Sequence, residues 1–373
     1  MSLSTANVCP AILTSLSDNL INNPANVAIH GGTLAALNDP SNLRSGQIIR
    51  QANDNGTGTS REVRVVFKQR QIASDAVDTK NCTPGDQMNY IESTFQVNNY
   101  RGVSFTLSEA QLRTYCAAYS ELVQLTGSTD PNQIVTRANA IGAAGGALSV
   151  VREMFTDFQL SANALVQAMN ADLLASISGS VGNWYGGASN PTYVVENADG
   201  AIRAAGLFGM KQNYMNTGFN GAPIIIGGAG SLQRVWMNDS RYFGQGANGI
   251  DFSTVRTNTG IAEFYFDTNV ADALTDENSA VVFAPGSLVY TPYLQYVGSY
   301  GQIGVMNRFT MPIPGLPQVK CDVRILPDEC NETYAVWMEC YFDVFAAPTT
   351  LFPEGDSNDG VNGIFTAQFT TAA

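Results

Sequence analysis

The chain has 373 residues, of which 45% are hydrophobic, so it is long enough for one large or two moderate folded cores. Only 14% of its residues are charged, where about 25% is usual, and uncharged polar residues and glycine take their place. Uncharged polar groups can be buried against a neighbouring molecule at a lower cost than ions, although some low-charge secreted proteins have a similar composition. The net charge of −13 disfavours a protein that grips nucleic acid through a basic surface, but not one that encloses it.

The sequence shows no recognisable targeting or membrane segment. The first basic residue is Arg44, so the N-terminus lacks the positive region of a signal peptide. No uninterrupted apolar stretch reaches the roughly 18 residues that a membrane helix needs. We therefore expect a soluble protein that is made in a cytoplasm.

Six cysteines are spread along the chain, and no two of them have the CxxC spacing of zinc ribbons or thioredoxin-like sites. Their density is also below that of a disulfide scaffold. We therefore expect free, mostly buried thiols and no metal site at Cys9, Cys82, Cys116, Cys321, Cys330 and Cys340.

Residues 1–60 are polar, weakly periodic and rich in turn signals, which predicts an extended arm that packs along another surface. A two-stranded excursion follows at 61–105, with a polar tip at 74–89 between its strands. Isolated hairpins are marginal in water, so we expect this one to project from the globular body and to bury its apolar face on another molecule. The apolar residues of that face are Val63, Val65, Phe67, Phe95 and Val97.

The densest basic cluster of the chain lies on the same excursion, at Arg61, Arg64, Lys68 and Arg70. On one face of a strand these side chains form a positive stripe. The stripe lacks the interleaved aromatic residues on which the bases of single-stranded nucleic acids stack. We interpret it as a contact to an acidic protein surface, with nucleic acid as the alternative.

Three helical stretches follow the excursion. Ser108 and Gln111 form a capping-box pattern that predicts the start of a helix. A second helical stretch begins at Asp130, and the strongest helical periodicity of the chain runs from 148 to 177. The apolar stripe expected on the first helix comprises Leu112, Tyr115, Tyr119 and Leu122, and that on the longest helix comprises Val151, Phe155, Phe158, Leu165, Met169 and Leu173.

The second half of the chain begins after a Gly- and Asn-rich break at 179–191, which we interpret as a boundary between subdomains. Short helices and strands alternate over 200–300, including a buried strand at 222–227. Alternating apolar residues from 318 to 346, interrupted by a turn at 327–332, predict an antiparallel strand pair. The acidic, glycine-containing tail from Glu354 is expected to be loosely held.

The sequence contains few candidate catalytic residues. His30 is the only histidine, and beside Gly31 and Gly32 we interpret it as a turn or interface residue rather than part of a Ser-His-Asp or Cys-His site. The segment 223–235 begins like a dinucleotide fingerprint with Gly228 and Gly230, but Gln233 stands where the third glycine belongs, so we interpret it as a structural turn. The acidic pairs Asp276/Glu277 and Asp328/Glu329 lie in polar turns and read as surface carboxylates. We expect no enzyme, no cofactor and no metal.

The order of these parts resembles the Hong Kong 97-type major capsid proteins of tailed bacteriophages. The resemblance rests on YRGVSFTLSEAQL at the foot of the excursion, ALVQAMNADLLASI in the long helix, APIIIG in the mixed region and YAVWMECYFDVFAAP in the last strand. It implies an α+β capsid fold with an N-terminal arm, an extended E-loop hairpin, a long spine helix, and peripheral and axial domains. The implied boundaries are an arm at 1–60, an E-loop at 61–105, the spine helix with peripheral helices at 106–199, an axial domain at 200–310, a peripheral strand pair at 311–346 and a tail at 347–373.

The resemblance implies a structural subunit that self-assembles, as pentamers and hexamers, into the icosahedral capsid around double-stranded DNA. The E-loop would then cross onto a neighbouring subunit, and the capsid would be assembled in the cytoplasm of a host bacterium. The implied partners are other copies of the chain, a portal, and decoration or scaffolding proteins, with DNA enclosed but not specifically bound and no membrane. An encapsulin-like nanocompartment shell of the same fold is the alternative, and an enzyme with a glycine-rich phosphate site is a more distant one.

Overall fold

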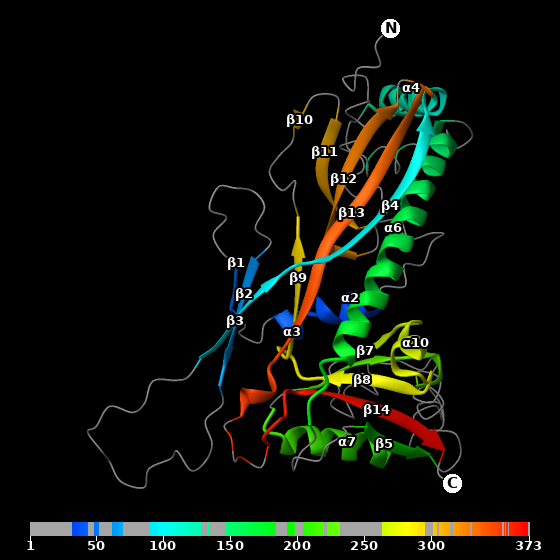
Figure 1. Cartoon of the computed structure of the whole chain (residues 1–373). Coiled ribbons are helices and arrows are strands. Elements are labelled where there is room, and N and C mark those ends of the chain that lie inside the picture. Colours follow the sequence, from blue (N-terminus) through cyan, green and yellow to red (C-terminus); the bar gives the residue numbers. More distant parts are fainter. Residues whose placement is uncertain are drawn as a thin grey trace. The chain divides into compact units, whose positions relative to one another are not determined.

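The computed structural model shows a mixed α/β protein (Figure 1). It describes residues 32–43, 48–51, 62–69, 90–127, 133, 137, 147–183, 192–197, 204–219, 222–231, 263–294, 301–303, 306–313, 316–328, 330–352, 354, 356 and 358–371. These residues fall into two compact units, each built from segments that are distant in the sequence. None of the helices in this part of the chain is both long and apolar enough to span a membrane.

The first unit comprises the described residues of 99–169 and 292–341. Its sheet has the strand order β10-β11-β12-β13-β4, and the pairs β10–β11, β11–β12 and β12–β13 are antiparallel. The long helix α6 (Ala147–Ser178) begins in this unit, where Phe158 packs edge-on against Phe105 of β4, with ring centroids 4.8 Å apart. The strands are β4 (Asn99–Ser108), β10 (Gly301–Ile303), β11 (Met306–Ile313), β12 (Leu316–Asp328) and β13 (Thr333–Ala346), the last of which leaves the unit after Tyr341.

Helix α4 (Glu109–Thr126) confirms the predicted capping box. The Ser108 hydroxyl accepts a hydrogen bond from the Gln111 backbone N–H at 3.2 Å, and the Gln111 side chain accepts one from the Ser108 N–H at 3.0 Å. These contacts satisfy backbone donors that the first helical turn leaves without partners. The helix ends at Gly127, whose φ of 61° places it in the left-handed region that glycine adopts most easily. The predicted stripe of Leu112, Tyr115, Tyr119 and Leu122 is buried.

The second unit comprises the described residues of 31–98, 170–291 and 342–371. Its larger sheet has the order β5-β14-β8-β6-β7. Strand β14 is parallel to β5 and antiparallel to β8, and β6 is antiparallel to β8 and parallel to β7. The strands are β5 (Thr192–Asn197), β6 (Ile224–Gly227), β7 (Glu263–Phe266), β8 (Ser279–Phe283) and β14 (Ile364–Thr371).

A smaller antiparallel sheet of the second unit has the order β1-β2-β3. It consists of β1 (Ile48–Gln51), β2 (Glu62–Lys68) and β3 (Tyr90–Gln96). The remaining elements are α2 (Gly32–Leu37), α3 (Pro40–Leu43), α7 (Ala204–Asn216), α10 (Val270–Leu274), the short helix η4 (Thr349–Leu351) and β9 (Leu288–Tyr293), whose last two residues belong to the first unit.

Buried polar side chains form hydrogen bonds between α2 and α3 and the rest of the second unit. The carboxylate of Asp267 accepts hydrogen bonds from the Thr33 backbone N–H at 3.0 Å and from the Thr33 hydroxyl at 2.5 Å. Asn170 accepts from the Leu34 N–H at 3.1 Å. Asn42 donates to the carbonyls of Leu37 and Leu288 and accepts from the Gly286 N–H. Unpaired buried polar groups are costly, so these contacts stabilise one placement of the two helices.

The structure corrects three of our expectations. The described part of 1–60 is no extended arm, because it forms α2, α3 and β1, and α2 is buried. The predicted strand at 90–105 is two strands that join different sheets, with β3 in the second unit and β4 in the first. The tail is not loosely held over Ile364–Thr371, because β14 lies between β5 and β8. The helical stretch expected from Asp130 lies mostly outside the described residues.

Candidate interaction surfaces

The apolar face of the predicted E-loop is already covered within its own chain. Val63, Val65 and Phe67 of β2 and Val97 after β3 are buried. Phe95 of β3 stacks on Phe345 with 4.3 Å between ring centroids. Four of the five side chains that we expected to be buried on another subunit are therefore buried within this chain, and the fifth, Phe95, is half-buried against Phe345.

The opposite face of β2 and β3 carries the polar groups of the excursion. Arg64 forms an ion pair with Glu92 of β3, and both side chains remain partly exposed. Lys68 is exposed at the end of β2. Arg61 and Arg70 lie outside the described residues. The structure thus gives Arg64 a partner in its own chain, and of the four cations of the predicted stripe it describes Arg64 and Lys68.

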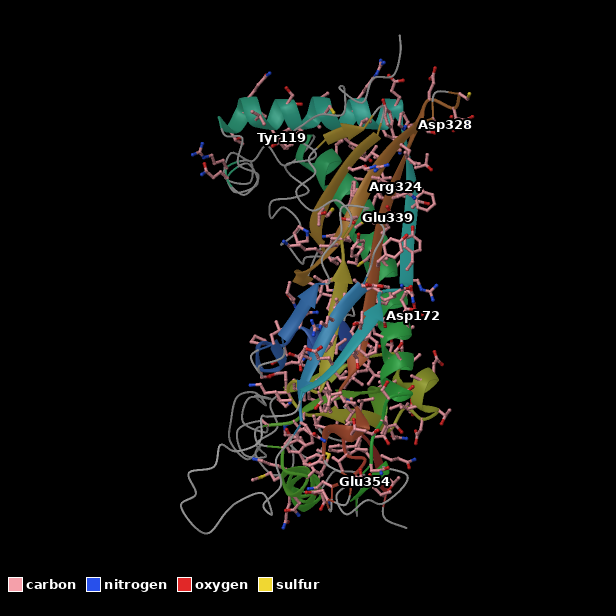
Figure 2. All side chains as sticks on the ribbon, turned by 60° about the vertical axis from the view of Figure 1, so that its left-hand side comes forward. Tyr119, Asp172, Arg324, Asp328, Glu339 and Glu354 are labelled. Carbon is pink, nitrogen blue, oxygen red and sulfur yellow. The ribbon has the colours of Figure 1, made fainter. Side chains whose placement is uncertain are left out.

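A second polar surface, which our sequence reasoning missed, lies on the sheet of the first unit. The Tyr100 hydroxyl of β4 donates a hydrogen bond to a Glu339 carboxylate oxygen of β13 at 2.8 Å. The same carboxylate lies 3.3 Å from the Arg324 guanidinium of β12 (Figure 2). Arg324 also stacks over the Trp337 ring at 5.2 Å. Three neighbouring strands are thereby joined by one network of charges and rings.

This surface extends along the same face of the sheet. Thr310 of β11 donates to a carboxylate oxygen of Asp322 at 2.6 Å, and Arg308 lies directly across the strand pair from Arg324. Side chains alternate between the two faces of a strand, so Lys320, Asp322 and Arg324 share one face of β12. We call this set the aromatic–basic face: Tyr100, Arg308, Thr310, Lys320, Asp322, Arg324, Trp337, Glu339 and Tyr341.

The electrostatics of the face are set by burial. Asp322 and Glu339 are buried, whereas Lys320 is exposed. Desolvation, followed by the hydrogen bond to Glu339, raises the pKa of Tyr100 to about 12, so its phenol stays protonated as a donor. The two carboxylates therefore have hydrogen-bonding partners within the face, and the exposed charge of the face is the cation of Lys320.

A signal for this face was present in the sequence. On β13 the residues between buried Val336, Met338 and Cys340 are Trp337, Glu339 and Tyr341. On β12 the residues between buried Val319, Cys321 and Val323 are Lys320 and Asp322. Large aromatic and charged side chains at every second position of paired strands indicate an organised outer face rather than a plain solvated one.

The candidate catalytic positions have structural roles where they are described. A Cβ at Gly228 would lie 2.4 Å from the Glu277 carbonyl oxygen, and one at Gly230 would lie 2.4 Å from the Asn278 side chain. The glycine turn is thus filled by the protein's own chain, as expected for a structural turn. Asp276 accepts hydrogen bonds from Asn278 and Gln368, and Asp328 accepts them from Cys330 and Asn331.

His30, Glu329 and the cysteines are the remaining candidates for catalysis or metal binding. His30 and Glu329 lie outside the described residues, and within the described ranges no group of three His, Cys, Asp or Glu side chains could hold a metal ion. The described cysteines are free thiols, as predicted, with Cys321 and Cys340 buried, Cys116 half-buried and Cys330 exposed. Burial raises the pKa of the Cys321 thiol well above its ordinary value, which makes it a poor nucleophile.

No protein-family model and no curated protein sequence matches this chain. Among solved structures, it is similar to the capsid asymmetric unit of cyanophage A-1(L), with 11% identity over 95% of this chain and 96% of that one and a TM-score of 0.47. It is also similar to the capsid of Ralstonia phage GP4, with 11% identity, 83% of both chains covered and a TM-score of 0.39. The capsid of an empty GTA particle matches with 10% identity over 84% of this chain and 92% of that one, at a TM-score of 0.38. Its structural neighbours are capsid proteins.

Proposed function

We propose that this chain is a structural subunit that self-assembles into the icosahedral capsid of a tailed bacteriophage and encloses its double-stranded DNA. The observation that carries the proposal is the way the first unit is assembled. In the sequence, the mixed region of α7, β6, β7 and β8 stands between the long helix α6 and the long strand pair β12–β13. In the structure, however, α6 begins in the same unit as this strand pair. A spine helix and a peripheral strand pair that flank an inserted axial domain are the arrangement implied by the Hong Kong 97-type resemblance.

The remaining parts are assigned on the same grounds. Residues 61–105 contain the E-loop, and 106–199 contain the spine helix and peripheral helices. The axial domain begins near residue 200. Because β10 and β11 belong to the sheet of the first unit, we assign the peripheral part from 292 onward rather than from 311. The exposed polar face of β2 and β3, with Arg64 and Lys68, is the part of the E-loop available to a neighbouring subunit. The low charged fraction of 14% favours a protein that covers much of its surface with copies of itself, because polar amides are easier to desolvate than ions.

Electron microscopy of the purified chain, with analytical ultracentrifugation, tests this function. We expect closed icosahedral shells in equilibrium with pentamers, hexamers or single subunits. Particles formed during phage infection should contain double-stranded DNA, whereas a nanocompartment of the same fold would contain protein cargo. A chain that stays monomeric across concentration, salt and crowding agents would contradict the proposal.

A further inference from the structure

The aromatic–basic face has the composition of a protein contact. Tyr100 is 40% exposed, and its ring lies 4.8 Å from that of Tyr341, which in turn lies 6.4 Å from the ring of Tyr293. Arg324 is held over Trp337 and against Glu339. Tyr, Trp and Arg are the residue types that contribute most to binding at protein interfaces. Because these rings and this guanidinium are already held by one another, little side-chain freedom is lost when a partner covers them.

The charge of the face indicates what it binds. Its carboxylates, Asp322 and Glu339, are buried and hydrogen-bonded, so its exposed charge is the cation of Lys320, beside the half-buried guanidinium groups of Arg308 and Arg324. The chain as a whole has a net charge of −13. Another copy of this chain therefore presents mostly acidic surface, which is complementary to the face and would favour their encounter.

The same face is poorly suited to nucleic acid. The Tyr100 and Tyr341 rings contact each other at a tilted angle, and Arg324 lies over the Trp337 ring, so the rings are not arranged as separate platforms for bases.

We propose that the aromatic–basic face is an inter-subunit contact that receives an acidic surface of a second copy of this chain. This inference rests on the proposed shell function and names one of the contacts that such a shell requires. The exposed cation Lys320 steers the acidic partner, and Tyr100, Tyr341 and Trp337 form the part that becomes desolvated.

Charge reversal at Lys320 tests the electrostatic part. Lys320→Glu leaves the network of Arg324, Glu339 and Tyr100 in place because the Lys320 side chain is exposed. We expect the critical subunit concentration for particle formation to rise by up to about fivefold at low salt, since an exposed ion pair is worth up to about 1 kcal/mol. The matched control is Arg113→Glu on α4, where the side chain is 73% exposed and lies outside the face. An equal effect of both substitutions contradicts the proposal.

Hydroxyl-radical footprinting of the wild-type chain tests the location directly and requires no substitution. We expect Tyr100 and Tyr341 to lose reactivity on passing from free subunits to particles, with buried Tyr334 as the internal reference. A wild-type chain that never assembles contradicts the shell function itself. Particles in which Tyr100 and Tyr341 remain as reactive as in the subunit contradict this contact alone. Protection that appears only when DNA is added identifies nucleic acid as the occupant and also overturns the proposal.

Discussion

Tyr100 on β4 donates its phenolic proton to Glu339 on β13, with 2.8 Å between the two oxygens. Glu339 is buried, and its carboxylate also lies 3.3 Å from the guanidinium of Arg324 on β12. A buried carboxylate with fewer donors is strongly disfavoured. The pair thus joins the edge strand β4 to the long strands β12 and β13.

Tyr100→Phe should lower the free energy of unfolding by about 1–2 kcal/mol, because it removes a hydrogen bond to a charged group from a partly exposed site. Urea denaturation monitored by circular dichroism measures this change. Tyr293→Phe is the matched control, since its ring contacts Tyr341 without a hydrogen bond to Glu339. We expect the control to change the free energy by about 0.5 kcal/mol or less.

The same hydrogen bond has a pH signature. The pKa of Tyr100 is raised to about 12 in the folded protein, above the value near 10 of an unfolded tyrosine. The protonated phenol is the form that the fold favours, so its contribution is complete below about pH 10 and is lost as the pH rises toward 12. Tyr100→Phe should remove this part of the alkaline destabilisation.

Gly32→Ala should prevent α2 from docking. A Cβ at Gly32 would lie 1.8 Å from the backbone oxygen of Phe266, and neither backbone can move freely because Thr33 is hydrogen-bonded to Asp267. We expect a loss of about 3 kcal/mol or more, visible as a lower melting temperature and a lower soluble yield. At Gly179 the nearest atoms to an added Cβ are 3.7 Å away, so Gly179→Ala should be tolerated. A normal melting temperature for Gly32→Ala would show that α2 is not held against Phe266.

Local patterns in the sequence predicted the elements whose signals lie within a few residues. The capping box at Ser108, the helical spacing from 148 to 177 and the alternation in β12 and β13 are such signals, and the structure confirms them. Alternation shows that a face is apolar but not what covers it. The partner of Phe95 is Phe345, which is remote in sequence, and no local pattern could identify it.

The missed strand β14 illustrates the same limit. Its Phe365, Ala367 and Phe369 are buried on one face and alternate with the half-buried Thr366, Gln368 and Thr370, while Ile364 is buried on the other face. The alternation spans only a few residues, one of its apolar positions is a small alanine, and it follows a polar, glycine-rich stretch, so the local signal for a strand is weak. Only its pairing with β5 and β8 defines it.

Truncation after Gly363 should therefore abolish folding of the second unit. It removes β14 from between β5 and β8, and with it the buried side chains of Ile364, Ala367 and Phe369. Each such side chain contributes roughly 1–3 kcal/mol, which together approaches the whole stability of a typical domain. We expect insoluble protein, measured as the soluble fraction after expression. Truncation after Thr371 keeps β14 and serves as the control that should remain soluble.

Asp157→Asn should stabilise the protein at neutral pH. Partial burial, and then the nearby charge of Glu153, raise the pKa of Asp157 on α6. The folded state therefore holds its proton more tightly than the unfolded chain, and stability falls as the pH rises from the unfolded value of about 3.9 through the folded one. The variant should melt at a higher temperature than wild type at pH 7, and the difference should shrink toward about pH 4. Glu153→Gln removes only the second cause and should give a smaller gain in the same direction.

The last prediction concerns the exposed face of β2 and β3. Arg64→Glu combined with Lys68→Glu should block particle formation while leaving a soluble, folded subunit, because it reverses two charges on the exposed face of β2 and β3, which we propose as the part of the E-loop that meets a neighbour. Each exposed pair is worth only about 0.2–1 kcal/mol, but the contact recurs at every subunit of a closed shell. Size-exclusion chromatography and electron microscopy of the variant beside wild type provide the measurement.

The ion pair of Arg64 with Glu92 requires its own control in that experiment, since Arg64→Glu also places two carboxylates near each other on neighbouring strands. Combining Arg64→Glu with Glu92→Arg restores a pair within the chain and leaves Lys68 unchanged. If Arg64 acts only within its own hairpin, this exchange should assemble normally. If Arg64 meets an acidic neighbour, assembly should remain weakened at low salt and should recover in part at high salt, where the repulsion between the introduced glutamate and that neighbour is screened. Normal particles from Arg64→Glu with Lys68→Glu would show that both residues face solvent in the shell, and would leave the aromatic–basic face as the proposed charged contact between subunits.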